Sequence, residues 1–426
     1  MVEEIIPELK INDLGHDGRG VGKLNGYTVF IPGTLPGERV RARLVKKKKR
    51  FGEALLEEVL DASPHRRKPP CPVYSECGGC QLQHMDYSFQ VEFKQDRLVQ
   101  ALYRIGEAQD FPAPRIHAAG KEWNYRNKAT YHLQGSQVGF FSRQSRRVIP
   151  HEECALLPQE VNQIKKSLAD LLKQKIITSG KNFTVRTSFS HQQSLLILDQ
   201  SVKPGSSWEK VTTILRKENP ELLGIYQQGK GKREGRGIWG KSMIKEKMGD
   251  YTFELGPATF FQVNSEQREV LLERAKKIVL DLNCRNIGDL YAGAGVFGIN
   301  LAKHVDRVLA IEISREAVAE GKRKAQHAGL DNIEFHRGEV ERVFAKMPRE
   351  LDCVLLDPPR EGCHPNLWQL IEEKKVKNIV YISCNPATLA RDIAELQPLG
   401  YRIETLDLID MFPQTYHVEC LVRLCR

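Results

Sequence analysis

The chain of 426 residues contains no apolar run long enough to cross a membrane, since a spanning helix needs about 18 or more such residues. It also lacks a basic N-terminal segment, because its first ten residues, MVEEIIPELK, carry acids where a signal peptide carries bases. It shows neither an internal repeat nor a low-complexity tract. These absences argue against a membrane-spanning protein and a repeat array. We expect a cytoplasmic protein of roughly two to four domains.

Basic residues outnumber acidic ones, and they are unevenly spread. The 64 Lys and Arg against 54 Asp and Glu give a net charge of +10. The stretch RVRARLVKKKKR (39–50) holds eight bases and no acid, and a second cluster, HRRK, follows at 65–68. Many such runs are simply solvated faces, but Lys and Arg that neutralise phosphates gain from counterion release. The charge distribution therefore favours nucleic acid as a partner.

The ten cysteines are informative through their positions. In a reducing compartment we do not expect them to form disulfides. Three of them, in CPVYSECGGC (71–80), have a Cys-x5-Cys-x2-Cys spacing, and a fourth follows in HEEC (151–154). Four thiolates could hold an iron–sulfur cluster, but the spacing fits zinc equally well, with Cys154 or His84 as the fourth ligand. Unligated thiols are the remaining alternative.

Residues 1–62 alternate apolar and polar positions in five short segments separated by Gly- and Pro-containing turns. The segments are IIPELKINDL, GVGKL, GYTVFIP, ERVRARLV and FGEALLEEVL. This pattern predicts a small closed β-barrel, and OB-like barrels commonly bind oligonucleotides. An SH3-like barrel without a ligand is the alternative. The stretch DASPHRRKPP (61–70) is typical of a linker.

The rest of the chain changes character near residue 256. Before it, the spacing of apolar residues predicts a helix at 87–106, and mostly strands over 121–255 with one helix at 158–174. After it, strands and helices alternate, which is typical of a parallel α/β sheet. We therefore expect a Rossmann-like α/β domain that follows a β-barrel and a central mixed α+β domain.

A glycine turn lies early in the α/β part. RNIGDLYAGAGVFGINLAKH (285–304) reads as strand, turn and helix, and Gly293, Gly295 and Gly298 fit G-x-G-x-x-G. Such a turn lets the backbone approach a ligand beside a helix N-terminus. The next strand ends at Glu312, where a carboxylate could hold a ribose hydroxyl. Dinucleotides such as NAD and S-adenosylmethionine share this geometry, and the glycines do not separate them.

Two later strands also end in reactive residue types. LDCVLLDPPREG (351–362) is a buried strand that ends at Asp357, and NIVYISCNPATLARD (378–392) is a strand broken at Cys384 with a proline suited to the first helical turn. Taken alone, Asp-Pro-Pro could be a stiff turn with a capping aspartate. Because ligands of open α/β sheets lie outside the carboxyl ends of the strands, we expect one shared crevice. It would collect Tyr291, Glu312, Asp357 and Cys384.

Cys384 and Glu419 suggest a specific chemistry. Backbone N–H groups and a helix dipole can lower the pKa of a cysteine at the head of a helix, so we expect a thiolate at Cys384. A thiolate can add to C6 of uracil and make C5 nucleophilic toward a sulfonium methyl group, after which a base must remove the C5 proton. Glu419, in YHVECLVRL (416–424), is the candidate base. Singly, the two residues could be a buried structural cysteine and a solvent-facing edge carboxylate.

Five motifs occur in order: FFQVN (260–264), DLYAGAG, DPPR, SCNP and the closing HVE. Together they resemble the RNA uracil-C5 methyltransferase family, of the bacterial 23S rRNA (uracil-5-)-methyltransferase type with a TRAM domain. The resemblance covers nearly the whole chain. It implies S-adenosylmethionine as the methyl donor, Cys384 as the nucleophile and Glu419 as the base.

The same resemblance implies further site residues and partners. Gln262 contacts the cofactor, Tyr291, Glu312 and Asp357 match cofactor-contacting positions, and Glu339 could face the adenine. A [4Fe-4S] cluster is implied in place of zinc, with a structural or RNA-positioning role that we hypothesise. Its ligands would be Cys71, Cys77, Cys80 and Cys154. The expected partner is 23S rRNA, with tRNA uridine 54 as the alternative; we expect no membrane partner and a monomer.

The resemblance divides the chain into three expected domains. A TRAM-like, RNA-binding barrel would span 1–62, a central iron–sulfur and RNA-binding domain 63–255, and the methyltransferase domain 256–426. The helix at 87–106 could pack with the catalytic part. Two rivals remain at this point. An NAD-linked iron–sulfur oxidoreductase gives Cys384 and Glu419 no role, and a non-catalytic RNA-binding protein would keep a dead methyltransferase fold.

The segment WNYRNKATYHL (123–133) interleaves aromatic rings with cations. Rings that stack on bases, alternating with cations that bind phosphates, suit unpaired RNA. A half-buried strand with its charges outward is the equal alternative. The residues concerned are Trp123, Tyr125, Arg126, Lys128 and Tyr131. The target base has to leave its stack before Cys384 can reach C6, and a basic barrel and central domain would serve that step.

Overall fold

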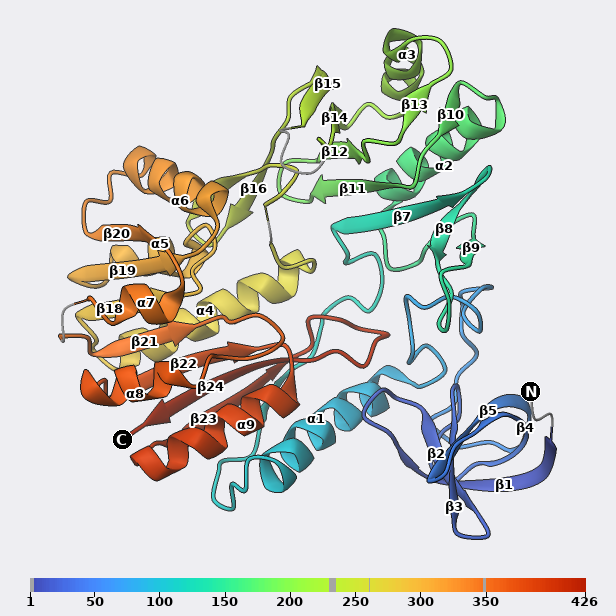
Figure 1. Ribbon diagram of the computed structural model, residues 1–426, viewed down its shortest axis with the longest axis horizontal. Coiled ribbons are helices and arrows are strands. Elements are labelled where there is room, and N and C mark those ends of the chain that lie inside the picture. Colours follow the sequence, from blue (N-terminus) through green and yellow to red (C-terminus); the bar gives the residue numbers. More distant parts are fainter. Residues whose placement is uncertain (1–3, 230–234, 260, 348–349) are drawn as a thin grey trace. The chain divides into compact units, whose positions relative to one another are not determined.

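The computed structural model describes residues 4–229, 235–259, 261–347 and 350–426 (Figure 1). The chain divides into two compact units, each assembled from three separate segments. The first unit consists of Met1–Arg97, Tyr131–Leu156 and Phe412–Tyr416. The second consists of Leu98–Thr130, Leu157–Met411 and His417–Arg426. The three sequence-based domains remain a prediction beside this division.

The first unit begins with a closed five-stranded barrel in the order β1-β2-β3-β5-β4. Its strands are β1 (Glu4–Leu14), β2 (Gly20–Leu24), β3 (Tyr27–Ile31), β4 (Arg39–Lys47) and β5 (Phe51–Asp61). Alternate apolar side chains of these strands fill the interior, among them Ile11, Val29 and Val40, all fully buried. The predicted closed barrel is confirmed, because each segment of alternating polarity forms one strand.

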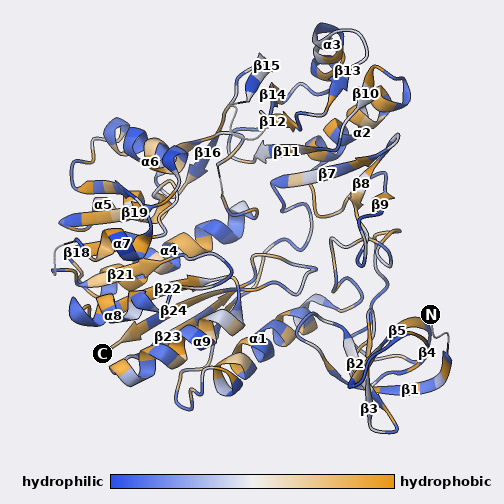
Figure 2. Cartoon of the chain, viewed as in Figure 1, coloured by the Kyte–Doolittle hydropathy of each residue, from blue (hydrophilic) through white to orange (hydrophobic). Residues whose placement is uncertain are grey.

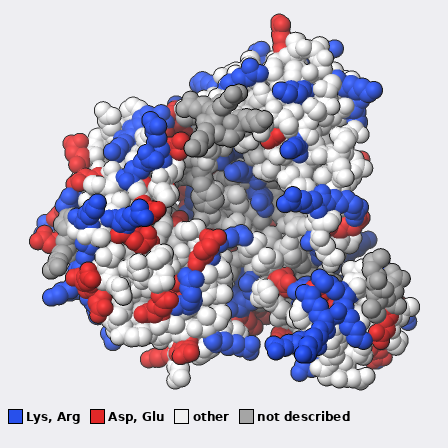
Figure 3. Space-filling view, viewed as in Figure 1, with Lys and Arg blue, Asp and Glu red and all other residues white. Residues whose placement is uncertain are grey.

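The basic run of residues 39–50 is partly neutralised within the barrel. Arg41 pairs with Glu58 at 2.7 Å, and Arg43 pairs with Glu57 at 3.0 Å. Arg39 likewise pairs with carboxylates of the neighbouring strands. The turn Lys48–Arg50 has no ion pair within the described part of the chain. The uncompensated charge of this run therefore lies at the β4–β5 turn. Figure 3 shows Lys and Arg side chains gathered over the barrel, with acidic side chains beside them.

The rest of the first unit centres on the short segment Phe412–Tyr416. The first half of α1 (Tyr87–Arg104) holds this segment: the Nζ of Lys94 donates to the carbonyl of Phe412 at 3.0 Å. The carboxamide of Gln90 exchanges two hydrogen bonds with Gln414, each of 3.0 Å. The backbone N–H groups of Gln81 and Leu82 both donate to the Gln414 carbonyl. The segment is therefore fixed by both backbone and side-chain bonds.

The second unit contains an eight-stranded sheet in the order β20-β19-β18-β21-β22-β24-β23-β6. Its strands are β6 (Arg115–His117), β18 (Asn286–Leu290), β19 (Arg307–Glu312), β20 (Ile333–Arg337), β21 (Cys353–Leu356), β22 (Asn378–Ser383), β23 (Arg402–Ile409) and β24 (Glu419–Cys425). The five strands β18 to β22 are parallel, and β24 is antiparallel to both its neighbours. Their near-continuous apolar runs, visible in Figure 2, suit a sheet buried on both faces. The predicted parallel α/β sheet is confirmed.

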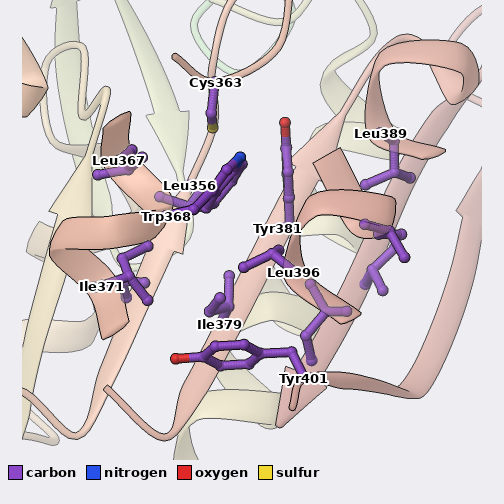
Figure 4. Packing of buried hydrophobic residues seen from close by; sticks show 14 of the residues in the cluster. Leu356, Cys363, Leu367, Trp368, Ile371, Ile379, Tyr381, Leu389, Leu396 and Tyr401 are labelled. Atoms are coloured by element: carbon purple, nitrogen blue, oxygen red, sulfur yellow. The ribbon is translucent and has the colours of Figure 1, made fainter. Parts of the chain in front are cut away.

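Helices cover this sheet. The helices α4 (Ser265–Asp281), α5 (Val296–Ala302) and α6 (Arg315–His327) pack together, with α4 against β22–β24 and the other two against β19. Another group, α7 (Val340–Phe344), α8 (Asn366–Glu373) and α9 (Pro386–Leu396), contributes to one large apolar cluster. Figure 4 shows part of it, with Trp368 of α8 beside Tyr381 of β22. Leu98 and Leu102 of α1 belong to the same cluster.

The strands from β7 to β17 form further sheets. In the second unit β15-β14-β12-β11 lie in that order with the first residues of β7 beside β11, and β16-β17 and β10-β13 are two-stranded sheets; in the first unit β7, β8 and β9 are neighbours. Their bounds are β7 (Lys128–Gln134), β8 (Gln137–Phe141), β9 (Val148–Pro150), β10 (Ile177–Ser179), β11 (Asn182–Ser188), β12 (Gln193–Leu198), β13 (Lys203–Pro204), β14 (Leu222–Gln227), β15 (Arg236–Gly240), β16 (Ile244–Met248) and β17 (Tyr251–Leu255). β7 starts in the second unit and continues into the first.

Two helices flank the smaller sheets. The predicted helix at 158–174 is confirmed as α2 (Gln159–Lys173). The sequence patterns missed α3 (Trp208–Glu218), which begins where the Ser207 hydroxyl accepts a hydrogen bond from the backbone N–H of Lys210 at 3.3 Å. Among the residues with described positions, no helix has both the length and the apolar character required for a transmembrane span.

Candidate active site

The register of the large sheet brings the predicted strand ends to one edge. Leu290 pairs with both Ile311 and Leu356, and Leu356 pairs with Tyr381. The residues that follow these strands therefore emerge together; they are Tyr291, Glu312, Asp357 and Cys384. Because β24 is antiparallel, its first residue, Glu419, lies at this same edge. All five belong to the second unit.

The three glycines of the turn after β18 serve different purposes. Gly293 has a φ of 56°, and a Cβ there would meet no atom within 4 Å. At Gly295 a Cβ would come within 2.5 Å of the Phe335 ring, and at Gly298 within 2.8 Å of Asp289 Oδ2. Only Gly293 leaves open space of the kind that a ligand could occupy, whereas the other two glycines allow helix α5 to pack.

Asp289, the first residue of the DLYAGAG motif and the next-to-last of β18, was not among the sequence-predicted site residues. It is buried, and its Oδ2 accepts a hydrogen bond from the Gly298 N–H at 2.9 Å. Burial raises the pKa of its carboxyl to about 7, and the charges of Asp357 and Glu312 add to the effect. Its Oδ1 has no hydrogen-bond partner among the described residues. Asp289 thus fixes the glycine turn. Its place in the motif DLYAGAG is the feature of the sequence from which it could have been predicted.

Glu312 holds the glycine turn from the neighbouring strand. Its carboxylate accepts from the Gly293 N–H at 2.9 Å and from the Ser314 N–H at 2.7 Å. Each carboxylate oxygen can accept a second donor, so a ribose hydroxyl could still bind. Tyr291, at the start of the turn, has a φ of 63°, a strained conformation for an aromatic residue. Its hydroxyl donates to Glu341 at 2.9 Å.

The DPPR loop after β21 is tied to the cysteine-bearing junction. The carbonyl of Arg360 accepts hydrogen bonds from Asn385 Nδ2 at 3.2 Å and from Thr388 Oγ1 at 3.3 Å. The half-buried Asp357 precedes it, and burial raises the pKa of its carboxyl to about 7. The loop thereby places one cation and one carboxyl beside Cys384.

Cys384 is half-buried between β22 and α9, as its strand–helix position predicts. The prediction of a lowered thiol pKa is wrong. Burial, followed by the charge of Glu419, raises the pKa of Cys384 to about 11, although a hydrogen bond and the charge of Arg360 oppose this. The physical reason is that desolvation and a nearby carboxylate outweigh the helix terminus, whose Ala387 N–H is already capped by the Asn385 side chain at 3.1 Å. The resting residue is a neutral thiol.

Glu419 is buried rather than solvent-facing, with an exposed fraction of only 1%. Its Oε2 has no hydrogen-bond partner among the described residues. Burial raises the pKa of its carboxyl well above the ordinary value, the charge of Asp357 adds to this, and Arg360 opposes it. A buried carboxyl with an unsatisfied oxygen is costly and is typical of a group that functions on a substrate.

Asp392, on α9, joins three parts of the site. Its Oδ2 accepts from the Cys363 N–H at 3.0 Å and from the Tyr381 hydroxyl at 2.5 Å, while its Oδ1 accepts from Arg391 at 2.6 Å. The carboxylate therefore ties the loop after β21 to β22 and to the helix that follows Cys384. It was not predicted, although it ends the quoted stretch NIVYISCNPATLARD.

Two predicted cofactor residues have fewer described contacts. The motif FFQVN begins at residue 260, which lies outside the described residues, and Gln262 is half-buried. The Gln262 carbonyl accepts from Asn127 Nδ2 at 3.3 Å, which fixes the loop. Glu339 is exposed after β20 and pairs with Arg342 at 2.8 Å. Contact of Gln262 and Glu339 with a cofactor stays a prediction.

The four predicted metal-ligating cysteines lie in the first unit and are neighbours. Cys71 and Cys154 are half-buried, whereas Cys77 and Cys80 are buried. Burial raises the pKa of Cys80 to about 12, with contributions from the charges of Cys154, Cys77 and Cys71. Within the described residues, however, no three His, Cys, Asp or Glu side chains meet as a metal ligand set. The iron–sulfur cluster and zinc therefore both stay predictions at this point.

His84, the alternative zinc ligand, is buried beside the cysteine loop. Its Nδ1 shares a hydrogen bond of 2.7 Å with the Tyr74 hydroxyl, and its Nε2 has no partner within the described part of the chain. Burial, with the charge of Arg66, lowers the pKa of His84 to about 3, so the ring is neutral. Arg143 also fixes the loop by donating to the carbonyls of Cys77 and Cys80 at 3.2 and 3.0 Å.

The aromatic residues of the segment 123–133 do not all face solvent. Tyr125 is 3% exposed and Tyr131 fully buried, where it stacks on Phe140 with ring centroids 4.9 Å apart. For these two rings the base-stacking hypothesis is wrong, because they already fill the core. The cations of the segment, Arg126 and Lys128, are half-buried and remain candidates for contact with RNA.

The sheet order and the strand-end residues define a class I S-adenosylmethionine-dependent methyltransferase, carried together with an N-terminal barrel. Residues 86–426 match the family model described as tRNA (Uracil-5-)-methyltransferase, and residues 6–56 match the TRAM domain. The chain belongs to the tRNA (uracil-5-)-methyltransferase family.

Similar proteins cover nearly the whole chain. The chain is 34% identical to an uncharacterized RNA methyltransferase of Halalkalibacterium halodurans, over 98% of this chain and 96% of the relative. It is 36% identical to another from Synechocystis sp., over 98% and 95%. A solved structure of the Pyrococcus abyssi tRNA (uracil-54, C5)-methyltransferase in complex with S-adenosyl-L-homocysteine matches with a TM-score of 0.80 and 27% identity, covering 98% of this chain and 99% of that one.

These findings establish an S-adenosylmethionine-dependent RNA (uracil-5-)-methyltransferase. They set aside both rivals, the NAD-linked oxidoreductase and the non-catalytic RNA-binding protein.

Proposed function

We propose that the enzyme methylates C5 of a specific uridine through a covalent adduct between Cys384 and C6 of the base. One observation carries this proposal: Cys384 and Glu419 meet at the same edge of the sheet, and the carboxyl oxygen Oε2 of Glu419 is buried without a partner among the described residues. A buried oxygen without a partner destabilises the free protein, and it is explained if this oxygen accepts a proton from the bound substrate.

The reaction balances in three steps. The Cys384 thiol loses its proton to solvent, and the thiolate sulfur bonds to C6, which moves an electron pair through C5 onto the C4 carbonyl oxygen. The C5 carbon then attacks the sulfonium methyl group, and S-adenosylhomocysteine leaves. Finally the Glu419 carboxylate removes the C5 proton, the C5–C6 double bond forms again, and the thiolate is expelled.

The charges around Cys384 fit this sequence. Arg360 opposes the effects that raise the pKa of the thiol and of Glu419, so it favours the ionised form of each. The open space at Gly293 and the carboxylate of Glu312 offer a place for the donor, with Tyr291 at the start of the same turn and Asp357 directly after the adjacent β21. Gln262 and Glu339 would contact the cofactor from outside the sheet.

For the RNA target we propose 23S rRNA. The proposal rests on the cysteine spacing 71–80 with Cys154 and on the TRAM barrel, which resemble the bacterial 23S-type enzymes. A second candidate is uridine 54 of tRNA. It is favoured by the likeness to the Pyrococcus abyssi enzyme, whose name specifies that position.

We also propose that the cysteine neighbours hold a [4Fe-4S] cluster once assembled, with a structural or RNA-positioning role. The interaction of the Cys80 thiol with those of Cys71, Cys77 and Cys154 supports it, because it shows that the four thiols are neighbours. Anaerobically purified protein should contain about four iron atoms per chain, and Cys80→Ser should lose them. Bound zinc in place of iron would contradict this assignment. A cluster-free variant that still bound and methylated RNA normally would contradict the role.

The covalent mechanism and the target can be tested together with 5-fluorouridine-substituted RNA. Fluorine at C5 cannot leave as a proton, so the adduct should survive a denaturing gel. Wild-type enzyme and Cys384→Ala would be incubated anaerobically with S-adenosylmethionine and with transcribed 23S rRNA fragments or tRNA. An adduct that needs the donor and the thiol supports the mechanism, and the RNA that traps identifies the target. If folded enzyme traps no RNA but still transfers methyl groups, the covalent route is wrong.

A further inference from the structure

Two cations face each other directly on adjacent strands beside the loop that carries Gln262. The Thr187 N–H on β11 donates to the Asn127 carbonyl at 2.8 Å, and the hydroxyls of Thr130 and Thr184 are 2.8 Å apart. Both contacts correspond to the same antiparallel register, which sets Lys128 opposite Arg186. Like charges placed directly opposite on neighbouring strands destabilise a sheet, so this pair costs folding free energy.

A third cation joins the pair, and no described carboxylate compensates it. Arg126 lies two residues before Lys128 and donates from Nε to the Lys128 carbonyl at 3.1 Å. Neither Arg126, Lys128 nor Arg186 forms an ion pair among the described residues. The neighbouring carboxylate of β16, Glu246, is already bound by Arg268 at 3.1 Å and by the hydroxyls of three serines.

The burial of these side chains raises the free-energy cost of keeping them charged. Arg186 is only 3% exposed, and Lys128 is half-buried. Burial, with the charges of Arg186 and Arg126, lowers the pKa of Lys128 to about 8, and burial lowers that of Arg186 to about 10. Partly desolvated cations without counterions are typical of sites that bind an anion.

The cluster is also joined by hydrogen bonds to the loop that carries Gln262, a predicted residue of the candidate active site. The guanidinium of Arg186 donates to the carbonyls of Gly256 and Thr259 at 3.1 and 2.5 Å. Asn127, which lies between Arg126 and Lys128, donates from its N–H to the Val263 carbonyl at 2.8 Å. The loop with Gln262 is thus held on one side by Arg186 and on the other by the residue between the two other cations.

We propose that Arg126, Lys128 and Arg186 form a binding site for one backbone phosphate of the substrate RNA, close to the uridine that reacts. The inference rests on the proposed function, because it assumes that Gln262 lies beside the bound donor and base. The phosphate supplies the missing counter-charge, and the fixed loop links its position to that of the reacting base.

The test uses two single variants of the full-length protein, Lys128→Gln and Arg126→Gln. Arg186 is left intact because it also holds the loop. Binding of transcribed RNA, measured by fluorescence anisotropy, should weaken about tenfold, and the slope of log Kd against log salt should fall by about 0.7 to 1. Lys128→Arg should retain binding. Lys217→Gln, which changes an exposed lysine of α3 in the same unit, serves as the matched control and should leave the slope unchanged.

Two further measurements separate the alternatives. The affinity for S-adenosylmethionine, measured by calorimetry, should not change, since a weakened donor with unchanged RNA binding would assign the cations to the donor's carboxylate. The Tm of Lys128→Gln should stay equal or rise, because like-charge repulsion is removed; a fall would indicate a structural lysine. RNA binding does not depend on turnover. A salt slope that is unchanged in the Lys128→Gln and Arg126→Gln variants therefore overturns this site alone. Wild-type enzyme that is inactive on every RNA contradicts the proposed function alone.

Discussion

Glu419 opens β24 one residue before Cys420, which pairs with the Ser383 that precedes Cys384. The two reacting groups are thus placed by one antiparallel pairing, and the charge of Glu419 contributes to the raised pKa of the thiol. In the free enzyme the pKa of Cys384 is raised to about 11, and burial raises the pKa of Glu419 well above its ordinary value, so the protonated form of each is favoured. The reaction requires both Cys384 and Glu419 in the deprotonated form, and this requirement has measurable consequences.

The first consequence concerns pH. Deprotonation of Cys384 and Glu419 is required, and the pKa of each is raised, so the active fraction of free enzyme grows as the pH increases. Because the pKa of Cys384 is about 11, we expect kcat/KM for RNA to rise about tenfold per unit between about pH 6 and about pH 8, and more steeply wherever Glu419 also titrates. Initial rates of methyl transfer at constant ionic strength would measure it. A flat profile over this range would contradict the raised pKa values.

The second concerns the order of steps. Glu419→Gln removes the base but keeps the size of the side chain, so the methylated adduct should form and persist on ordinary uridine RNA. Denaturing gels with donor labelled in the methyl group should show protein-bound label, whereas the wild type should show free methylated RNA. The double variant with Cys384→Ala should show none. Cys425→Ala, at the far end of the same strand, is the matched control and should behave as wild type.

The third concerns Asp392, a positioning residue. Asp392→Ala would leave the Tyr381 hydroxyl and the Cys363 N–H without their acceptor, so the free energy of unfolding should fall by about 3 kcal/mol. Asp281→Ala, which breaks an exposed ion pair with Lys277, should cost less than about 0.5 kcal/mol. Urea denaturation measures both. In the folded fraction, kcat should fall while the RNA KM changes little; equal stability losses in the two variants would contradict this role.

The fourth concerns the barrel. Replacing Lys48, Lys49 and Arg50 together with Gln should weaken RNA binding and lower the salt slope by about two. The paired arginines offer a matched control, since Arg41→Gln and Arg43→Gln change exposed bases already compensated by glutamates. Anisotropy with the same transcribed RNA compares them. Equal effects of the two sets would show that pairing within the barrel does not decide which bases bind RNA.

Much of the architecture was predictable because it depends on local periodicity. Alternating polarity marked each barrel strand, and the buried apolar runs marked β21 and β22 together with their ends at Asp357 and Cys384. Once the sheet was taken as parallel, a common edge for these residues followed from the direction of the strands.

What could not be predicted depends on contacts between distant residues. The raised pKa of Cys384 comes from burial and from the charge of Glu419. The residues next to Cys384 in the sequence indicate neither of these causes. The apposition of Lys128 and Arg186 depends on the register of two strands far apart in the chain. The buried state of Tyr131 likewise depends on its partner Phe140. In the segment 123–133 the cations therefore remain candidates for contact with RNA, whereas the rings of Tyr125 and Tyr131 are buried.

The segment Phe412–Tyr416, held by Gln90 and Lys94, belongs to the first unit, yet the chain returns to the second unit only two residues before Glu419. The chain passes between the units at five points, the last of them just ahead of the candidate base. No single cut can therefore release an intact catalytic half. A gene fusion or truncation placed at any one junction would leave each piece missing part of its core, so the two units have to be inherited, expressed and engineered as one.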